Sequence, residues 1–195
     1  MDLSRSTAAA AMIVGGALTT LLFIPFTIAH GPTSVNLERE VVGWDMHTWG
    51  LLMGTVPPLL ISTGLWALRP TLSGGRTAAR RALTVMCVAM VLFAAMNAAF
   101  RAIGPPFDLL LLAPASVVVA LTSAKRGRVR VLLATLAAAY VIGLALALVP
   151  SEFYDRYDGY RIFGIVAYAG VGALWAVLGT SLLREGREAV ELSPA

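Results

Sequence analysis

The sequence predicts an all-α polytopic membrane protein, a bundle of six transmembrane helices with both termini in the cytoplasm. Of its 195 residues, 58% are hydrophobic and only 13% are charged, whereas roughly a quarter of the residues of a soluble domain carry a charge. The apolar residues form runs long enough to cross a bilayer, and short charged segments separate these runs. Because the runs fill the chain, residues 1–195 are expected to form a single transmembrane domain.

Six spans are expected from the apolar runs, at about 7–29, 46–68, 82–100, 107–122, 131–149 and 162–183. The first run is longer than the core of a secretory signal, about 7–15 residues, and no small-residue cleavage site follows it. We interpret it as a retained helix. The fourth run is the shortest and begins just after Pro105 and Pro106, and proline fits the first turn of a helix.

The second span carries a tryptophan near each end and two prolines near its middle. Trp49 and Trp66 are about 25 Å apart along a helix, and indole rings favour the headgroup level. They are therefore predicted to anchor opposite faces of the bilayer. The pair Pro57-Pro58 predicts a break, interpreted either as a transport site or as a simple kink.

The same prolines predict unsatisfied backbone groups. Each proline lacks a backbone N–H, so the carbonyls of Met53 and Gly54 lose their helical partners. Water, a neighbouring hydroxyl such as that of Ser62 or Thr63, or a ligand is expected to bond them. Small residues in the last two spans are predicted to let helices pack closely. They are Ala139, Gly143, Ala147, Gly172, Ala176 and Gly179.

The charges of the connecting segments alternate along the chain. Segments 1–6, 69–81, 123–130 and 184–195 hold eleven of the fifteen basic residues. Lys and Arg collect in cytoplasmic loops, which predicts that both termini are cytoplasmic. The composition, rich in Ala, Arg and Gly with one Lys, is typical of high-GC bacteria. The predicted location is therefore the bacterial plasma (inner) membrane, as a multi-pass protein.

Five polar residues are expected near the outer face and form the candidate catalytic site. They are Asp45, His47, Asn97, Arg101 and Asp108. Asn97 and Arg101 are four positions apart and share a helix face, and polar groups within a membrane usually face the bundle interior. The candidate site is an outward-facing acid–base pocket. The structural alternatives are an Arg101–Asp108 ion pair across a hairpin and His47 as an interfacial polar residue.

Metal or haem binding is a further interpretation of the outer residues. His30 and His47 could bind a divalent metal together with acids, or a haem iron axially, but no H-x-x-x-H or H-E-x-x-H spacing occurs. The acids Glu152, Asp155 and Asp158 are spaced as in some magnesium and diphosphate sites, with a solvated loop as the alternative. No cofactor is predicted, and the question of a metal stays open.

Two functions of different classes follow from the sequence. The first is a non-enzymatic membrane component, an accessory subunit or small carrier, which the scarcity of charges within the spans favours. The alternative is a membrane-embedded enzyme that acts on a lipid or isoprenoid, which the clustering of polar residues favours. The expected partners are the lipid bilayer and such a ligand, in a homo-oligomer or a larger complex. Nucleic acid is excluded because the basic residues lie at helix ends without interleaved aromatic residues.

Overall fold

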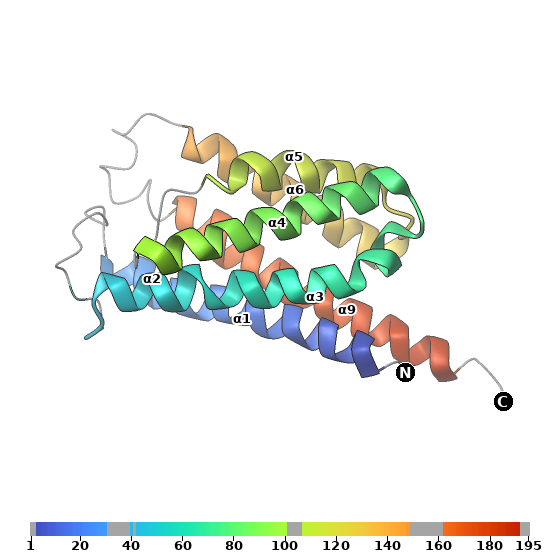
Figure 1. The fold of residues 1–195 in the computed structure, drawn as a ribbon, viewed down its shortest axis with the longest axis horizontal. Helices are drawn as coiled ribbons and strands as arrows, with labels where there is room; N and C mark the ends of the chain where they lie inside the picture. The colour runs from blue at the N-terminus through green and yellow to red at the C-terminus, as the bar shows by residue number, and fades with distance from the viewer. Residues whose placement is uncertain (1–2, 31–39, 41, 101–106, 149–161, 192–195) are drawn as a thin grey trace.

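Helices form every element of the part of the chain that the structure describes. This computed structural model describes residues 3–30, 40, 42–100, 107–148 and 162–191. The elements are α1 (Leu3–His30), α2 (Met46–Gly54), α3 (Val56–Ser73), α4 (Thr77–Phe100), α5 (Leu109–Thr122), α6 (Gly127–Ala147), the π-helix η1 (Ile165–Gly170) and α9 (Val171–Glu191). Because α2 leads into α3 and η1 into α9, the described residues form a bundle of six rods (Figure 1).

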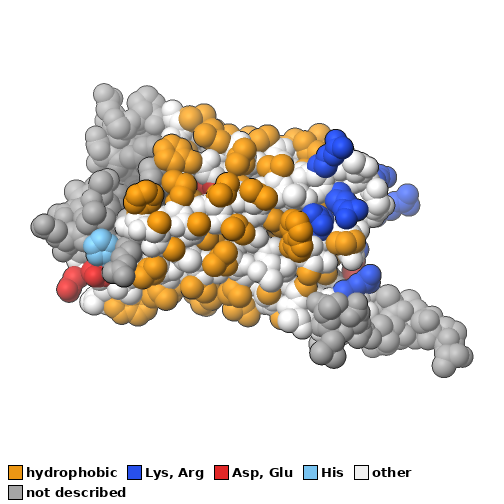
Figure 2. Space-filling model, in the orientation of Figure 1, with side chains coloured by type: hydrophobic (Ala, Val, Ile, Leu, Met, Phe, Trp, Pro, Cys, Tyr) orange, Lys and Arg blue, Asp and Glu red, His pale blue; other side chains and the backbone are white. Residues whose placement is uncertain are grey.

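Five of these rods are long and apolar enough to cross a membrane. They cover Arg5–Ile24, His47–Ser73, Thr77–Phe100, Gly127–Ala147 and Ile162–Gly186. The sixth, Leu109–Thr122, is apolar but shorter, as expected for the fourth run. Hydrophobic side chains cover the flank of the bundle that Figure 2 shows. For the described residues, the structure thus confirms an all-helical fold with several helices able to span a membrane.

Two helices begin earlier in the chain than the predicted spans, because each includes charged residues that precede its apolar run. Helix α4 begins at Thr77 rather than residue 82, and α6 begins at Gly127 rather than residue 131. Arginine is a good helix former, and its long side chain can reach the headgroups from a helix end. The apolar runs therefore predicted the membrane-length core of each helix but not its charged terminal turn.

Glycines bring the first and last helices into backbone contact. A Cβ atom on Gly172 of α9 would lie only 2.7 Å from the carbonyl oxygen of Gly16 on α1. On α6, a Cβ atom on Gly143 would lie 3.2 Å from the Cβ of Ala167 in η1. These contacts confirm the predicted packing role of Gly143 and Gly172, because larger side chains would force the helices apart.

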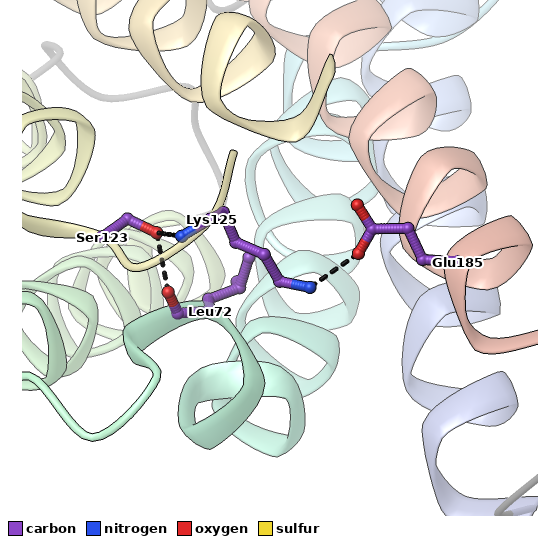
Figure 3. Close-up of polar contacts among 4 residues, drawn as sticks. All are labelled: Leu72, Ser123, Lys125 and Glu185. Atoms are coloured by element: carbon purple, nitrogen blue, oxygen red, sulfur yellow. Dashed lines mark hydrogen bonds and ion pairs between the residues drawn. The ribbon is translucent and has the colours of Figure 1, made fainter. Parts of the chain in front are cut away.

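At one end of the bundle, polar contacts join the α5–α6 connection to α3 and α9 (Figure 3). The hydroxyl of Ser123 donates to the Leu72 carbonyl across 2.7 Å and accepts from the Lys125 backbone N–H at 3.2 Å. The Lys125 ammonium forms an ion pair of 2.6 Å with Glu185. Lys and Arg side chains gather at this end in Figure 2, with carboxylates and a histidine at the opposite end.

Candidate functional site

The second span is broken where the two prolines predicted. Helix α2 ends at Gly54, Thr55 has φ −115° and ψ −57°, and α3 begins at Val56 with its prolines in the first turn. Proline is tolerated there because the first N–H groups of a helix have no partner within the helix. The break is therefore a helix end followed at once by a new helix start.

The carbonyl that loses its helical donor at this break is bonded by a side chain from α4. Asn97 Nδ2 donates to the Gly54 carbonyl oxygen across 3.1 Å and to the Phe93 carbonyl oxygen across 3.0 Å. The Gly54 carbonyl is the one that Pro58 leaves without a helical donor. The Asn97 side chain is 1% exposed, and a Cβ atom on Gly54 would lie 2.6 Å from its Cγ. A glycine is thus required for the amide to approach.

The hydroxyls expected to compensate for the prolines make other bonds. Ser62 Oγ donates to the Cys87 carbonyl on α4 across 3.2 Å, and Thr63 Oγ1 donates to the Leu59 carbonyl of its own helix across 2.8 Å. The prediction that Ser62 or Thr63 bonds the freed carbonyls is therefore wrong for Gly54. The actual donor to the Gly54 carbonyl is Asn97, which lies too far away in the sequence for the local pattern to indicate it.

A cavity of about 60 Å³ lies beside the break, and all six rods line it. Met53 of α2 and Pro58 of α3 contribute from the two sides of the break. The other lining residues are Thr19, Ile61, Met90, Phe93, Asp108, Leu109, Leu112, Tyr140, Ala167, Tyr168, Val171 and Trp175. At about 30 Å³ per molecule, a volume of this size holds about two water molecules.

Aromatic side chains form much of the cavity wall. Trp175 Nε1 donates to the Tyr140 hydroxyl oxygen across 2.9 Å, and both side chains are buried. Tyr168 stacks on Phe23 with ring centroids 4.6 Å apart. Tyr168 belongs to the π-helix, and such segments are frequent at functional sites.

The π-helix is held by a hydroxyl from α1. Thr20 Oγ1 donates to the Ala169 carbonyl across 2.9 Å and also lies 3.2 Å from the Gly16 carbonyl of its own helix. A π-helical segment changes the register of backbone bonding where it meets an α-helix. The Thr20 hydroxyl of α1 therefore supplies a hydrogen-bond donor to the Ala169 carbonyl, which lies close to this junction.

Asp108 brings a carboxylate into the cavity wall. Its backbone is helical (φ −59°, ψ −29°), and its carbonyl oxygen accepts the N–H groups of Leu111 and Leu112 at 3.0 and 2.8 Å. Its side chain makes no capping bond to α5, although Asp is a common cap. Among the described residues no basic side chain forms a salt bridge with it. Arg101 lies outside the described residues, and so does the proposed Arg101–Asp108 pair.

The remaining predicted site residues lie elsewhere. Asp45 caps α2, since its Oδ1 accepts the backbone N–H of Thr48 at 2.7 Å. The His47 side chain is exposed. Asp45, His47 and Asn97 are not among the residues that line the cavity with Asp108. Their catalytic role stays a prediction.

The proposed metal ligands lie mostly outside what the structure describes. Residues Glu152, Asp155 and Asp158 belong to an undescribed stretch, and the side chain of His30 is likewise not described. Within the described residues, no group of three or more His, Cys, Asp or Glu side chains could hold a metal ion. The interpretations that involve these four residues are therefore open to experiment.

Sequence reasoning missed Tyr140 and Trp175, although a signal was present. Both have polar tips within apolar runs, and such tips usually find a partner when buried.

The prediction that Trp49 anchors the chain at the membrane surface was wrong, because Trp49 is 2% exposed and packs with Phe23 inside the bundle. Trp66 is 49% exposed, with the Arg69 guanidinium carbon 3.9 Å from its ring centroid. Of these two tryptophans, Trp66 alone is accessible enough to act as an anchor.

No protein-family model matches this chain, and no curated protein or solved structure matches it. The chemistry of the cavity is defined by its own side chains. Among the described residues, the lining includes one acidic residue, Asp108, and four aromatic residues, Phe93, Tyr140, Tyr168 and Trp175, in an otherwise largely aliphatic wall. None of the described residues that line it is basic.

Proposed function

We propose that this protein is a small non-enzymatic carrier of the bacterial plasma membrane and that the cavity is its ligand site. One observation carries the proposal: Met53 and Pro58, on the two sides of the helix break, both line the cavity. A change of bend at Thr55 would therefore change the shape of the cavity. Interrupted helices next to a central site are typical of secondary transporters.

The proposed topology has six crossings, including the short α5, and cytoplasmic termini. The gathering of Lys and Arg at one end of the bundle supports this orientation. In Figure 1 the start of α1 and the end of α9 lie at the same end. Fusions of a cytoplasm-dependent reporter to each terminus test the orientation. A terminus found on the outer side would contradict it.

Access to the cavity from both sides of the membrane tests the carrier. Cys87 is the only cysteine of the chain and is 3% exposed, so a Cys87→Ala background removes the native thiol. Leu112→Cys then places a thiol in the cavity wall, because Leu112 is buried and lines it. Leu110→Cys is the matched control, since Leu110 is 52% exposed on the flank of the same helix.

The reagent is a small, charged methanethiosulfonate, in cationic and anionic forms, applied to right-side-out and inverted vesicles. A carrier exposes its site alternately to the two sides, so Leu112→Cys is expected to react from both. Leu110→Cys should react from neither side, because a charged reagent does not enter the hydrocarbon region. Reaction of Leu112→Cys from one side only would contradict a carrier and favour a fixed accessory subunit.

The second candidate function is a membrane-embedded enzyme that acts on a lipid or isoprenoid. Asp108 and the Tyr140 hydroxyl line the same cavity, and this favours it because carboxylates and phenols can serve as acids and bases. Incubation of the purified protein with a total lipid extract, followed by mass spectrometry, tests it. Product formation that Asp108→Asn or His47→Ala abolishes, with the fold intact, would replace the carrier by the enzyme.

A further inference from the structure

A groove lies on the flank of the bundle between α3 and α4, which run side by side (Figure 1). Its volume is about 360 Å³, within the range of about 300–1,000 Å³ that is usual for ligand sites. Exposed side chains of both helices line it, Trp66 from α3 and Val88, Val91 and Leu92 from α4. The structure describes every residue of 56–100, the segment that forms this α3–α4 groove.

The polar atoms of the groove bond to neighbouring backbone groups. Ser62 Oγ donates to the Cys87 carbonyl oxygen across 3.2 Å, and Cys87 Sγ donates to the Ser62 carbonyl oxygen across 3.7 Å. Thr63 Oγ1 donates to the Leu59 carbonyl oxygen across 2.8 Å. Because these donors are already used, the groove offers mainly apolar surface. It is therefore suited to a hydrocarbon chain.

A guanidinium group is held at one end of the α3–α4 groove. The Arg69 guanidinium carbon lies 3.9 Å from the centroid of the Trp66 ring. Arg69 Nη1 donates to Thr84 Oγ1 of α4 across 2.8 Å. The ring and the hydroxyl together fix the positive charge between the two helices, next to the apolar lining.

Arg69 retains hydrogen-bond donors for a further partner. A guanidinium has five N–H groups, and the bond to Thr84 uses one of them. Among the described residues, Nε is buried without a hydrogen-bond partner, and no carboxylate forms a salt bridge with Arg69. A partly buried guanidinium with such donors is complementary to an anion, and its planar fork matches the oxygens of a phosphate.

Further positive charge lies at the same end of the groove. Arg80 is exposed, and Arg80, Thr84 and Val88 are spaced by four residues on one face of α4. Figure 2 shows Lys and Arg side chains gathered at this end of the bundle. Basic groups next to an apolar groove reproduce the order of an anionic headgroup and its acyl chains.

The length of the groove agrees with the depth of a lipid chain. Arg69 lies seven residues after Ser62, about 10 Å along α3. One leaflet of hydrocarbon is about 15 Å deep, half of a core of about 30 Å. A lipid with its phosphate at Arg69 would lay the first part of one chain along the groove. The rest of that chain stays in the bilayer, so the groove holds only part of it.

We propose that the α3–α4 groove binds an anionic phospholipid, with its phosphate on Arg69 and one acyl chain against Trp66 and Val88. A net negative headgroup is favoured because Arg69 and Arg80 repel the ammonium of a zwitterionic one. This inference goes beyond the proposed carrier and does not involve its cavity. It requires only that α3 and α4 lie in the membrane.

Native mass spectrometry of the purified full chain, released from detergent micelles, tests the inference by counting bound lipids. Dioleoylphosphatidylglycerol, which is anionic, is mixed in equal amount with dioleoylphosphatidylcholine, which has the same chains and a zwitterionic headgroup. The first lipid to bind should be phosphatidylglycerol, favoured about fivefold or more. Glycerophosphoglycerol, the same headgroup without chains, should not compete at the same concentration. These comparisons use the unmodified protein and do not depend on any variant folding.

Variants then locate the phosphate and the chain. Arg69→Gln should lower the preference for phosphatidylglycerol about fivefold, whereas Arg130→Gln, at an exposed arginine near the start of α6, should leave it unchanged. Val88→Trp fills the groove and should weaken the binding of both lipids about tenfold. Val85→Trp is its control, because Val85 is exposed on the same helix but does not line the groove. Circular dichroism and size-exclusion chromatography confirm that each variant is folded.

Equal binding of the two lipids, full competition by glycerophosphoglycerol, or an unchanged preference in a folded Arg69→Gln would overturn the inference. A lipid-free dimer that Val88→Trp dissociates would also overturn it, because a second copy would then cover the groove. The carrier is judged separately by the Leu112→Cys experiment. Labelling from both sides with equal binding of the two lipids would retain the carrier and refute the lipid site. The expected preference with labelling from one side only would retain the lipid site and refute the carrier.

Discussion

The side-chain amide of Asn97 donates a 3.1 Å hydrogen bond to the backbone carbonyl of Gly54, 43 positions earlier in the chain. Pro58 cannot bond this carbonyl because it has no N–H. A buried carbonyl left without a donor costs about 1–3 kcal/mol, and α4 supplies the missing donor. The break between α2 and α3 is thus stabilised by a neighbouring helix and is part of the folded structure.

Asn97→Ala is expected to lower the free energy of unfolding by about 1–2 kcal/mol, because it leaves the Gly54 carbonyl without its donor. Denaturant titration in detergent measures the loss. Thr63→Ala is the matched control, since the Thr63 hydroxyl is exposed and bonds only its own helix. The control should change the free energy by less than about 0.5 kcal/mol.

Coupling between Asn97 and Pro58 gives a sharper test of the same relationship. Pro58→Ala restores a backbone N–H that can bond the Gly54 carbonyl, so Asn97→Ala should then cost less. The difference should be about 0.5 kcal/mol or more in a double-mutant cycle. An equal cost of Asn97→Ala in both backgrounds would show that the amide does not replace the missing helical bond.

Gly172→Ala should destabilise the bundle by about 1–3 kcal/mol, because the added methyl group overpacks the α1–α9 contact. It would lie 2.7 Å from both the Gly16 carbonyl oxygen and the Thr20 hydroxyl oxygen. Gly186→Ala in the same helix is the control, since nothing lies within 4 Å of its added Cβ. That change should be neutral or stabilise by up to about 1 kcal/mol. Thermal unfolding of both variants decides whether the contact is as close as described.

The connection in Figure 3 predicts unequal effects of two neighbouring substitutions. Ser123→Ala should cost about 1–3 kcal/mol, because Ser123 is 2% exposed and the Leu72 carbonyl loses its donor. Lys125→Met should cost at most about 1 kcal/mol, because the ion pair with Glu185 is partly exposed. The effect of Lys125→Met should also shrink in high salt. Denaturant titration at two salt concentrations measures both, and the reverse order of costs would contradict the geometry.

Tyr140→Phe should lower the free energy of unfolding by about 1–3 kcal/mol, because the buried Trp175 N–H loses its acceptor. In a Trp175→Phe background the same change should cost much less, since no indole N–H remains to be bonded. Thermal unfolding of the single and double variants completes the cycle. Additive costs would mean that the two side chains do not depend on each other.

Local patterns in the sequence predicted the helical rods and the break. Apolar run lengths located the helical rods, and the missing N–H groups of Pro57 and Pro58 located the end of α2. Glycine spacing indicated close packing at Gly143 and Gly172. All of these depend on chemistry within a few residues, which a single sequence displays.

Relationships between distant segments could not be predicted in the same way. Nothing near Asn97 indicates that it bonds Gly54, because this depends on how α4 is rotated against α2. The burial of Trp49 likewise depends on contact with Phe23 of α1. The cavity arises only when all six rods are assembled, and the sequence therefore showed Asp108 without its aromatic neighbours.

The close approach of Gly16 and Gly172 has a consequence for how the protein is made. The first helix is synthesised about 150 residues before the helix that covers its glycine face, a delay of roughly eight to thirty seconds at usual rates of synthesis. During that interval the glycine face of α1 meets lipid or the insertion machinery instead of α9. Chains that end before α9 should therefore lack the contact between α1 and α9. Membrane quality-control proteases should degrade such chains faster than the full chain.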